Sequence, residues 1–448
     1  MNILILGYGL EGKSVETYFK SDPSLSEHVK IDILDSFTKE ELLFKDFAQY
    51  DLIFRTPSIP PKFVPAPPEK LTSVTKYFFH NCPCPIIGVT GTKGKGTTCT
   101  MIHNILATIG AEPNIYLVGN IGKPALDVLP DLTKNDLVIY ELSSFQLWDL
   151  DRSPAVSVVL RLEPDHLDVH DSLEEYFAAK KNIINFQSPS DFCIYFRENQ
   201  NTRNLVSAAK SQQLPYPLKP ADRPPALSGI LSALQIPGTF NRENLEAALL
   251  AAFAALKLSD NSLDFADFLA THESALTAVA KNFSPLPHHL EFVRELNGVK
   301  YYDDSFSTVF PSLDVALDAF PDQKIVLIAG GKDKGFDLAP AKRKIFDHPN
   351  LVKAVLIGET AEKLAENEDP EKYFLAGTDF SLAVEKAREF AEAELEREEE
   401  NSDTCLVDKE PKILPPLVLL SPCASSFDMF TSYKARGDEF KSLVNALK

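Results

Sequence analysis

The sequence predicts an α/β protein of several domains built on parallel sheets. Short apolar runs alternate with helical patterns in the first and last thirds of the chain, an order typical of strands joined by crossover helices. A glycine-rich turn follows the first apolar run, as in nucleotide-binding βαβ units. The chain has 448 residues, which is enough for roughly two to four domains.

The first segment has a Rossmann-like pattern that ends near Cys82. Strands are expected at Ile3–Leu6, Ile31–Leu34 and Asp51–Phe54, with a helix at Gly12–Lys20. A proline-rich stretch from Pro57 to Pro68 interrupts the pattern before a new strand begins at Ile86. Residues 1–82 are therefore expected to form one domain.

The middle segment, residues 83–284, combines strands with longer helical patterns. Strands are expected at Ile86–Val89, Leu137–Glu141, Ala155–Leu160 and Phe192–Phe196, and helices at Thr97–Ile109, Leu173–Asn185 and Glu243–Leu256. A second proline-rich stretch, from Pro215 to Pro225, is expected to loop around this domain. The alternation of strands and helices begins again near Pro285, so the middle domain is expected to end at residue 284.

The last segment, residues 285–448, again alternates strands with helices. Buried strands are expected at Lys324–Ala329, Val352–Ile357 and Leu417–Leu420. The charged run that ends at Asp403 is expected to be a solvated helix end followed by a surface loop.

Composition and charge exclude several classes of protein. The hydrophobic fraction of 44% is that of a globular chain, and no apolar run reaches the roughly 18–20 residues that span a bilayer. The N-terminus lacks the basic flank and cleavage site of a signal peptide, so a cytoplasmic protein is expected. The net charge of -19 opposes nonspecific nucleic-acid binding, so no nucleic-acid partner is expected. The protein is expected to be a monomer. The six cysteines are interpreted as scattered reduced thiols, because Cys82 and Cys84 lack CxxC spacing.

The first motif, GYGLEG, places Gly7, Gly9 and Gly12 between a strand and a helix, and Asp35 ends the next strand. Glycines permit a tight turn and let an anion approach the N-terminus of a helix. The motif alone is a weak signal, because a tight strand–helix turn without a ligand has the same pattern.

The sequence IIGVTGTKGKGTT is a stronger signal for a phosphate-binding loop. Backbone N–H groups of such a loop converge on phosphate oxygens, and Lys95 can reach the β- and γ-phosphates. The common loop has a Mg²⁺-binding hydroxyl directly after the lysine. Here Gly96 intervenes, so Thr97 is the expected metal ligand. The expected ATP-binding residues of the loop are Gly91, Thr92, Lys93, Gly94, Lys95, Gly96, Thr97 and Thr98.

Three further polar side chains follow the loop along the sequence. Glu141 ends an expected strand, where ligands bind in open α/β sheets, and can hold Mg²⁺ opposite the loop. His166 follows the next strand, and Lys180 lies on an expected helix. Each has a simpler interpretation by itself: a surface carboxylate, a hydrogen-bonded polar residue and a solvated charge.

Taken together, the motifs resemble those of the Mur ligases over nearly the whole chain. The matching segments stand in family order: Gly119–Gly122, Glu141–Leu147, Asp165–Asp168, Asp303–Ser305, Gly330–Gly335 and Ser421–Phe430. ELSSFQL and the last segment are most specific for the member that adds D-glutamate. The resemblance implies a Rossmann-like N-terminal domain, a P-loop NTPase-like central domain and a Rossmann-like C-terminal domain.

The resemblance also implies three binding sites, one per domain. The uridine-nucleotide substrate would contact Leu10, Glu11, Asp35, Ser36, Thr56, Ser58, Asn120 and His166. ATP would contact the phosphate loop and, beyond it, Asn241, Asn244, His289 and Asp304. The amino acid would contact Thr308, Lys334, Ser426, Phe427 and Tyr433.

The implied reaction joins D-glutamate to UDP-N-acetylmuramoyl-L-alanine through an acyl phosphate, a cytoplasmic step of peptidoglycan synthesis. Lys95 and Mg²⁺ offset the developing charge by an amount on the order of several kcal/mol. Thr97 and Glu141 would bind one Mg²⁺, and His166 and Lys180 a second. The family carbamylates this lysine, which requires a neutral amine, so Lys180 is expected to have a pKa lowered by burial.

Four positions depart from the family pattern. Gly96 is shared with folylpolyglutamate synthases, and Phe240 replaces a common His. His289 replaces a common Arg, so the transition-state phosphate is expected to be held differently. Phe306 replaces a Lys of better-known members, which removes one contact to the amino-acid carboxylate, although Lys334 and hydroxyl groups could still hold it.

Three alternative functions compete with this interpretation. A folylpolyglutamate synthase explains Gly96 but neither the opening domain nor ELSSFQL. A P-loop switch or motor leaves DHLD and Lys180 unexplained. A non-catalytic sensor of the uridine nucleotide is compatible with His289 and Phe306, whereas the retained catalytic set favours an enzyme. That set comprises Lys95, Glu141, His166 and Lys180.

Overall fold

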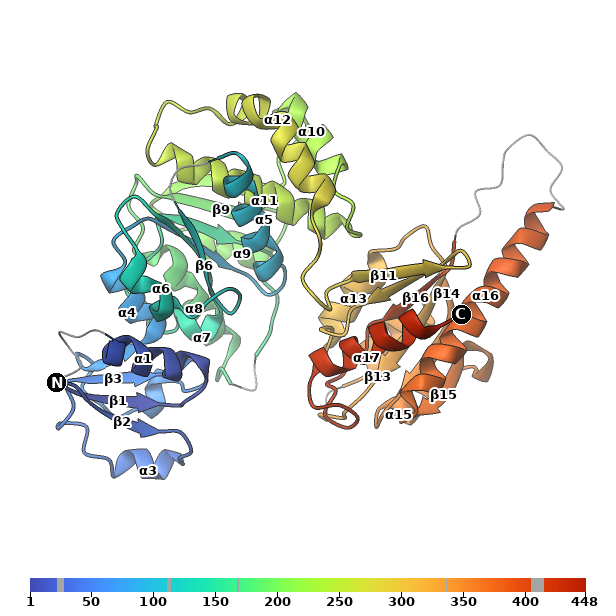
Figure 1. Ribbon diagram of the computed structural model, residues 1–448, viewed down its shortest axis with the longest axis horizontal. Coiled ribbons are helices and arrows are strands. Elements are labelled where there is room, and N and C mark those ends of the chain that lie inside the picture. Colours follow the sequence, from blue (N-terminus) through green and yellow to red (C-terminus); the bar gives the residue numbers. More distant parts are fainter. Residues whose placement is uncertain (22–27, 111–113, 167–168, 336, 404–414) are drawn as a thin grey trace. The chain divides into compact units, whose positions relative to one another are not determined.

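The computed structural model describes residues 1–21, 28–110, 114–166, 169–335, 337–403 and 415–448 (Figure 1). The described chain contains three sheets, which lie in two compact units. The first unit comprises Met1–Gln235 and Phe240–Phe283, and the second comprises Ile236–Thr239 and Ser284–Lys448. Among the described helices, none combines the length and apolar character needed to cross a membrane.

The first sheet has four parallel strands in the order β2-β1-β3-β4. Its elements are β1 (Asn2–Leu6), α1 (Leu10–Ser21), β2 (Lys30–Leu34), α3 (Lys39–Leu43), β3 (Leu52–Arg55), η1 (Pro61–Phe63), β4 (Leu71–Ser73) and α4 (Val74–Asn81). At Gly7, φ is 84° and an added Cβ would lie 2.3 Å from Thr56 Oγ1. The turn before α1 therefore requires glycine.

The second sheet has six parallel strands in the order β10-β9-β8-β5-β7-β6. The strands are β5 (Ile86–Thr90), β6 (Ile115–Gly119), β7 (Leu137–Glu141), β8 (Val156–Val159), β9 (Phe192–Phe196) and β10 (Gln212–Tyr216). The helices are α5 (Lys95–Thr108), α6 (Ala125–Val128), η2 (Leu129–Asp131), α7 (Ser144–Leu147), α8 (Leu173–Asn185), α9 (Gln200–Val206), η3 (Pro220–Asp222), α10 (Pro225–Ser232), α11 (Thr239–Lys257) and α12 (Phe265–Asn282).

Two expectations for this sheet were wrong in detail. The stretch from Pro215 to Pro225 is not only a loop, because β10 ends within it and α10 starts at its last residue. Helix α5 begins at Lys95 and not at Thr97, because Gly94 adopts the left-handed conformation (φ 83°) that ends the loop and allows the helix to start directly after it.

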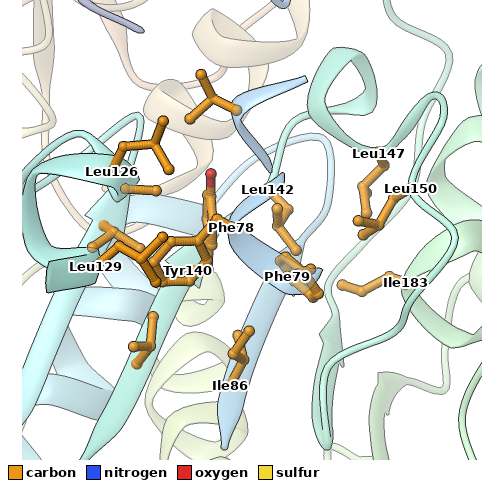
Figure 2. Packing of buried hydrophobic residues seen from close by; sticks show 14 of the residues in the cluster. Phe78, Phe79, Ile86, Leu126, Leu129, Tyr140, Leu142, Leu147, Leu150 and Ile183 are labelled. Atoms are coloured by element: carbon orange, nitrogen blue, oxygen red, sulfur yellow. The ribbon is translucent and has the colours of Figure 1, made fainter. Parts of the chain in front are cut away.

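One continuous hydrophobic core joins the first two sheets. Phe54 of β3 and Phe78 of α4 belong to the same buried cluster as Tyr140 of β7. The ring centroids of Phe78 and Tyr140 are 5.6 Å apart, and the hydroxyl groups of Thr75 and Tyr140 are 3.2 Å apart. Figure 2 shows Phe78 packed beside Tyr140. This packing explains why both sheets fall in one compact unit.

The third sheet has six strands in the order β11-β12-β16-β13-β14-β15, with only the β11–β12 pair antiparallel. The strands are β11 (Glu291–Leu296), β12 (Val299–Asp303), β13 (Ile325–Gly330), β14 (Leu351–Ile357), β15 (Tyr373–Gly377) and β16 (Leu417–Leu420). The helices are α13 (Phe310–Asp318), α14 (Ala339–Phe346), α15 (Ala361–Ala365), η4 (Pro370–Lys372), α16 (Phe380–Asp403) and α17 (Tyr433–Ala446).

Two features of the third sheet differ from the expectation. The β11–β12 hairpin turns at Asn297 and Gly298, both with positive φ, and this Asn-Gly pair is a hairpin signal that the sequence offered. Helix α16, which packs on β13 and β14 (Figure 1), continues to Asp403. The helix expected in the charged run is therefore confirmed, whereas the loop expected at its end, before Asp403, was wrong.

Candidate active site

The phosphate loop connects β5 to α5 at the carboxyl edge of the second sheet. An added Cβ at Gly91 would lie 2.6 Å from Leu160 Cβ, so the loop passes close to the segment after β8. The Thr92 amide donates to Arg161 O at 2.9 Å, which fixes the loop to that segment. The ammonium of Lys95 donates to Gly91 O at 3.1 Å and Thr92 O at 3.2 Å. The cation is thus held over the loop where phosphate would bind.

Lys180 on α8 is buried against the same loop. Only 2% of its surface is exposed, and its Nζ lies 3.1 Å from Gly91 O and 3.3 Å from Thr90 Oγ1. Burial, reinforced by the positive charge of Lys95, holds the pKa of Lys180 well below its ordinary range. The predicted lowering of this pKa is confirmed in direction. A neutral amine at this position is the form that can react with carbon dioxide.

Glu141 ends β7 beside the loop and is 7% exposed. Its Oε2 is buried and has no hydrogen-bond partner within the described chain. Burial raises the pKa of Glu141, while the nearby charge of Lys95 acts in the opposite direction. A buried carboxylate oxygen without a partner costs free energy, and an oxygen-seeking cation such as Mg²⁺ would satisfy it. Glu141 therefore fits a magnesium ligand, with the hydroxyl of Thr97 on α5 as the expected second ligand.

We expect Glu141→Gln to stabilise the metal-free protein at pH 7. The raised pKa means that the folded state binds more protons than the unfolded chain between the two pKa values, so stability falls as pH rises through that window and stays lower above it. Removing the charge should recover about 1 kcal/mol. Thermal unfolding in EDTA would measure this, and the gain should vanish below about pH 4. A less stable variant at pH 7 would contradict the assignment.

His166 lies on the loop after β8 with φ of 55°. Its amide donates to Asp165 Oδ1 at 2.9 Å, and its ring centroid is 4.8 Å from that of Phe145. Phe145 also stacks on His170, whose ring centroid is 4.3 Å from Trp148. These aromatic neighbours were not predicted, although Phe145 stands within the ELSSFQL motif. Residues 167 and 168, the second half of the DHLD motif, lie outside the described residues.

The start of α11 lies against the phosphate loop. Asn244 Nδ2 donates to Asn241 Oδ1 at 3.4 Å, and both residues are buried. An added Cβ at Gly94 would lie 2.7 Å from Asn244 Oδ1. The structure thus brings one of the two expected adenine-binding residues to the loop, across about 150 residues of sequence.

A cavity of about 670 Å³ opens at the carboxyl edge of the first sheet. Six of the eight residues expected to contact the uridine nucleotide line it: Leu10, Glu11, Asp35, Thr56, Ser58 and Asn120. Ser36 and His166 are not among the lining residues. Sequence reasoning missed Tyr8, Phe37, Lys39 and Phe63, which also line the cavity. Aromatic side chains directly after strands could have indicated a site for a flat ring.

The second unit contains the residues expected to bind the amino acid and also Asp304 and His289, which were expected to contact ATP. The carboxylate of Asp304 accepts from the Leu290 amide at 3.2 Å and from Ser421 Oγ at 2.9 Å. The ring of His289 stacks on that of Phe306 at 4.0 Å, and Phe306 lies 5.3 Å from Tyr433. Two of the four departures from the family pattern, His289 and Phe306, therefore form one aromatic stack.

Buried Arg436, which was not predicted, supports this region of the second unit. Its guanidinium donates to the oxygens of Ser305 and to Ala424 O. Of the other expected residues, Ser426 is buried and Phe427 is exposed.

The fold and the loop define the class of the protein. Three α/β sheets with a phosphate loop on the central one are the architecture of a nucleotide-dependent Mur-type ligase. A family model described as the Mur ligase middle domain matches residues 89–222. MurF from Acinetobacter baumannii has a similar structure, with a TM-score of 0.56 at 15% identity over 88% of this chain and 84% of that chain.

The particular family follows from sequence similarity. The chain is 33% identical to the UDP-N-acetylmuramoylalanine--D-glutamate ligase of Clostridium kluyveri, over 97% of this chain and 92% of the relative. It belongs to the family of UDP-N-acetylmuramoylalanine--D-glutamate ligases. A bifunctional folylpolyglutamate synthase/dihydrofolate synthase from Yersinia pestis has a TM-score of 0.53 at 15% identity, over 83% of this chain and 93% of that chain. This likeness shows a shared fold only.

Proposed function

We propose that the protein is an ATP-dependent ligase that joins D-glutamate to UDP-N-acetylmuramoyl-L-alanine in peptidoglycan synthesis. Family membership supports this activity. The observation that carries the proposal is the contact of buried Lys180 with Gly91 O of the phosphate loop, together with the buried Glu141 Oε2, which has no hydrogen-bond partner within the described chain. A motor or switch has no need of a buried lysine with a lowered pKa at its phosphate loop.

The first step makes the substrate carboxylate a better acyl donor. The carboxylate attacks the γ-phosphorus of ATP, ADP leaves, and an acyl phosphate forms. Lys95 and the loop amides of residues 91–97 would stabilise the charge on the phosphoryl oxygens. Mg²⁺, when bound by Thr97 and Glu141, would neutralise part of that charge. The neutral amine of D-glutamate then attacks the acyl carbon, its nitrogen loses one proton, and phosphate leaves from the tetrahedral intermediate and takes up that proton.

Lys180 would act as a carbamate in this reaction. Its neutral amine adds to carbon dioxide and releases one proton, which converts a buried neutral group into an anion. With His166, that anion would bind a second Mg²⁺ or position ATP. The low pKa caused by burial supports this role, because a protonated amine has no lone pair for the addition.

The remaining substrate contacts are proposed as the resemblance implies. The three functional domains would be residues 1–82, 83–284 and 285–448. The cavity of the first sheet would bind the uridine nucleotide. Asn241 and Asn244 would contact the adenine of ATP. Asp304 would contact the ribose of ATP, and His289 would contact the phosphate that is transferred. The amino acid would contact Thr308, Lys334, Ser426, Phe427 and Tyr433. The cytoplasmic location and the monomeric state remain predictions.

One assay tests the proposed function against its alternatives. The protein would be incubated with ATP, Mg²⁺, UDP-N-acetylmuramoyl-L-alanine and single D- or L-amino acids, and phosphate release measured. Release that requires both the uridine nucleotide and D-glutamate is the expected result. No release with D-glutamate would exclude this function, and release only with a folate and L-glutamate would establish a folylpolyglutamate synthase.

A further inference from the structure

Two cations flank the nucleotide cavity without belonging to its lining. Arg55 ends β3 directly before Thr56, and Lys62 stands between Pro60 and Phe63, all three of which line the cavity. The contacts of Arg55 and Lys62 reach elements of the second sheet. These side chains therefore connect the wall of one site to the scaffold of another.

Lys62 makes the connection to the helix that carries Lys180. Its Nζ lies 2.6 Å from Asp171 Oδ2 and 2.9 Å from Glu175 Oε1. The Asp171 amide also donates to Glu175 Oε2 at 2.6 Å, so the two carboxylates and the ammonium form one network at the N-terminus of α8. The side chains of Lys62 and Glu175 are 29% and 25% exposed, so this pair is less screened than an ordinary surface pair, whereas Asp171 is 77% exposed.

A second connection links the same cavity to the strand end that carries Glu141. Glu11 lines the cavity, and its Oε1 accepts a hydrogen bond from Gln146 Nε2 at 3.0 Å. Gln146 Oε1 in turn accepts from the Ser143 amide at 3.0 Å, which closes the capping box at the start of α7. The residue before Glu141, Tyr140, packs on Phe78 of α4 (Figure 2). The cavity and the strand that carries Glu141 are thus connected through contacts of Glu11, Gln146 and Tyr140.

We propose that Lys62 is a positioning residue that holds α8, and with it Lys180, at a fixed separation from the nucleotide cavity. The inference rests on the proposed function, in which a carboxylate bound through the cavity must meet the γ-phosphate at the loop. Reacting atoms need to approach within about 3–3.5 Å, and a misplacement of about 1 Å can lower the rate about 100-fold. Lys62 does not line the cavity, so its loss leaves the lining residues in place but removes the tie between η1 and the N-terminus of α8, which Ser172 still caps.

The test compares Lys62→Met with the charge-preserving Lys62→Arg. Lys62→Met should lower kcat about 10- to 100-fold and change the KM of the uridine nucleotide less than about twofold. Lys62→Arg should restore kcat to within about threefold of the parent. Lys30→Met serves as the control. The Lys30 side chain is 72% exposed, and its ion pair with Asp32 is long, at 3.7 Å, so its loss should leave kcat unchanged. An unchanged kcat in Lys62→Met, a raised KM at unchanged kcat, or equal losses in both Lys62 variants would overturn the proposal.

Glu175→Gln gives a second measurement that does not depend on the folding of Lys62→Met. It should also lower kcat, and the double variant should lose less than the product of the two single losses, because both remove one network. A loss of kcat in the double variant equal to the product of the two single losses would overturn the proposal.

A binding experiment separates this inference from the proposed function. Calorimetry would measure UDP binding with and without a non-hydrolysable ATP analogue. If the parent protein shows no D-glutamate-dependent turnover, the function fails. The positioning role still stands if the two ligands affect each other's affinity in the parent and not in Lys62→Met. Equal coupling in both proteins, or coupling in neither, would overturn the positioning role.

Discussion

Alanine in place of Lys180 is expected to lower D-glutamate-dependent phosphate release at least about 100-fold. The amine of Lys180 is buried against Gly91 O and Thr90 Oγ1, within electrostatic reach of Glu141 and Lys95. Its loss removes the nitrogen on which the carbamate would form. Added bicarbonate should therefore fail to restore activity. Initial rates at saturating ATP and Mg²⁺ would measure the effect.

Two variants control for indirect effects of this substitution. Lys181→Ala changes the next residue of the same helix, which is only half-buried, and should keep most of the activity. Lys180→Met retains an unbranched side chain of similar length without the amine and should be as inactive as Lys180→Ala. An active Lys180→Ala protein would show that the role of this lysine was wrongly assigned.

The largest expected effect on stability is that of Arg55→Met. Arg55 is completely buried and binds both carboxylate oxygens of Asp149, with Nε at 3.0 Å from Oδ2. It also donates to Ile59 O and Phe145 O. Removing one partner of a buried ion pair costs about 3–5 kcal/mol, because the other charge and the carbonyl groups lose their partner. Urea unfolding should show a lower midpoint at an unchanged slope.

Two further variants of this protein separate the loss of the buried ion pair from the general effect of removing a charge. Arg55→Met/Asp149→Leu removes both charges and should recover part of the stability, since an apolar pair can replace a buried ion pair. Lys20→Met breaks the exposed pair between Lys20 and Glu16 and should cost less than about 0.5 kcal/mol. Equal losses in Arg55→Met and Lys20→Met would contradict the assigned importance of the buried pair.

Local sequence patterns predicted much of the fold and the order of the site residues. The buried strand before Gly91 and the strand that ends at Glu141 have near-continuous apolar runs, which parallel strands covered on both faces produce. The family identity rested on motifs in a fixed order, and the similarity to known ligases confirms it. The roles of the individual site residues stay predictions.

Local patterns failed where the signal was short or polar. Strand β10 contains Gln212, Gln213 and Pro215, and sits at the edge of its sheet, where few apolar residues are required. The end of the charged run near Asp403 reads as irregular by composition, yet it continues a helix whose earlier turns pack on the third sheet. At β10 tertiary packing decided the outcome, whereas the last turns of α16 are rich in glutamate and arginine, which favour a helix by themselves.

The sequence by itself determined which chemical groups this protein has: a glycine loop with Lys95, a carboxylate at a strand end and a lysine on a helix. Only the tertiary structure decided that Lys180 meets the loop at Gly91, and that Arg55 and Lys62 join the cavity of the first sheet to α7 and α8. These contacts connect residues about 90 to 110 positions apart. Sequence periodicity is set by neighbours a few residues apart, so it carries no information about such distant pairs.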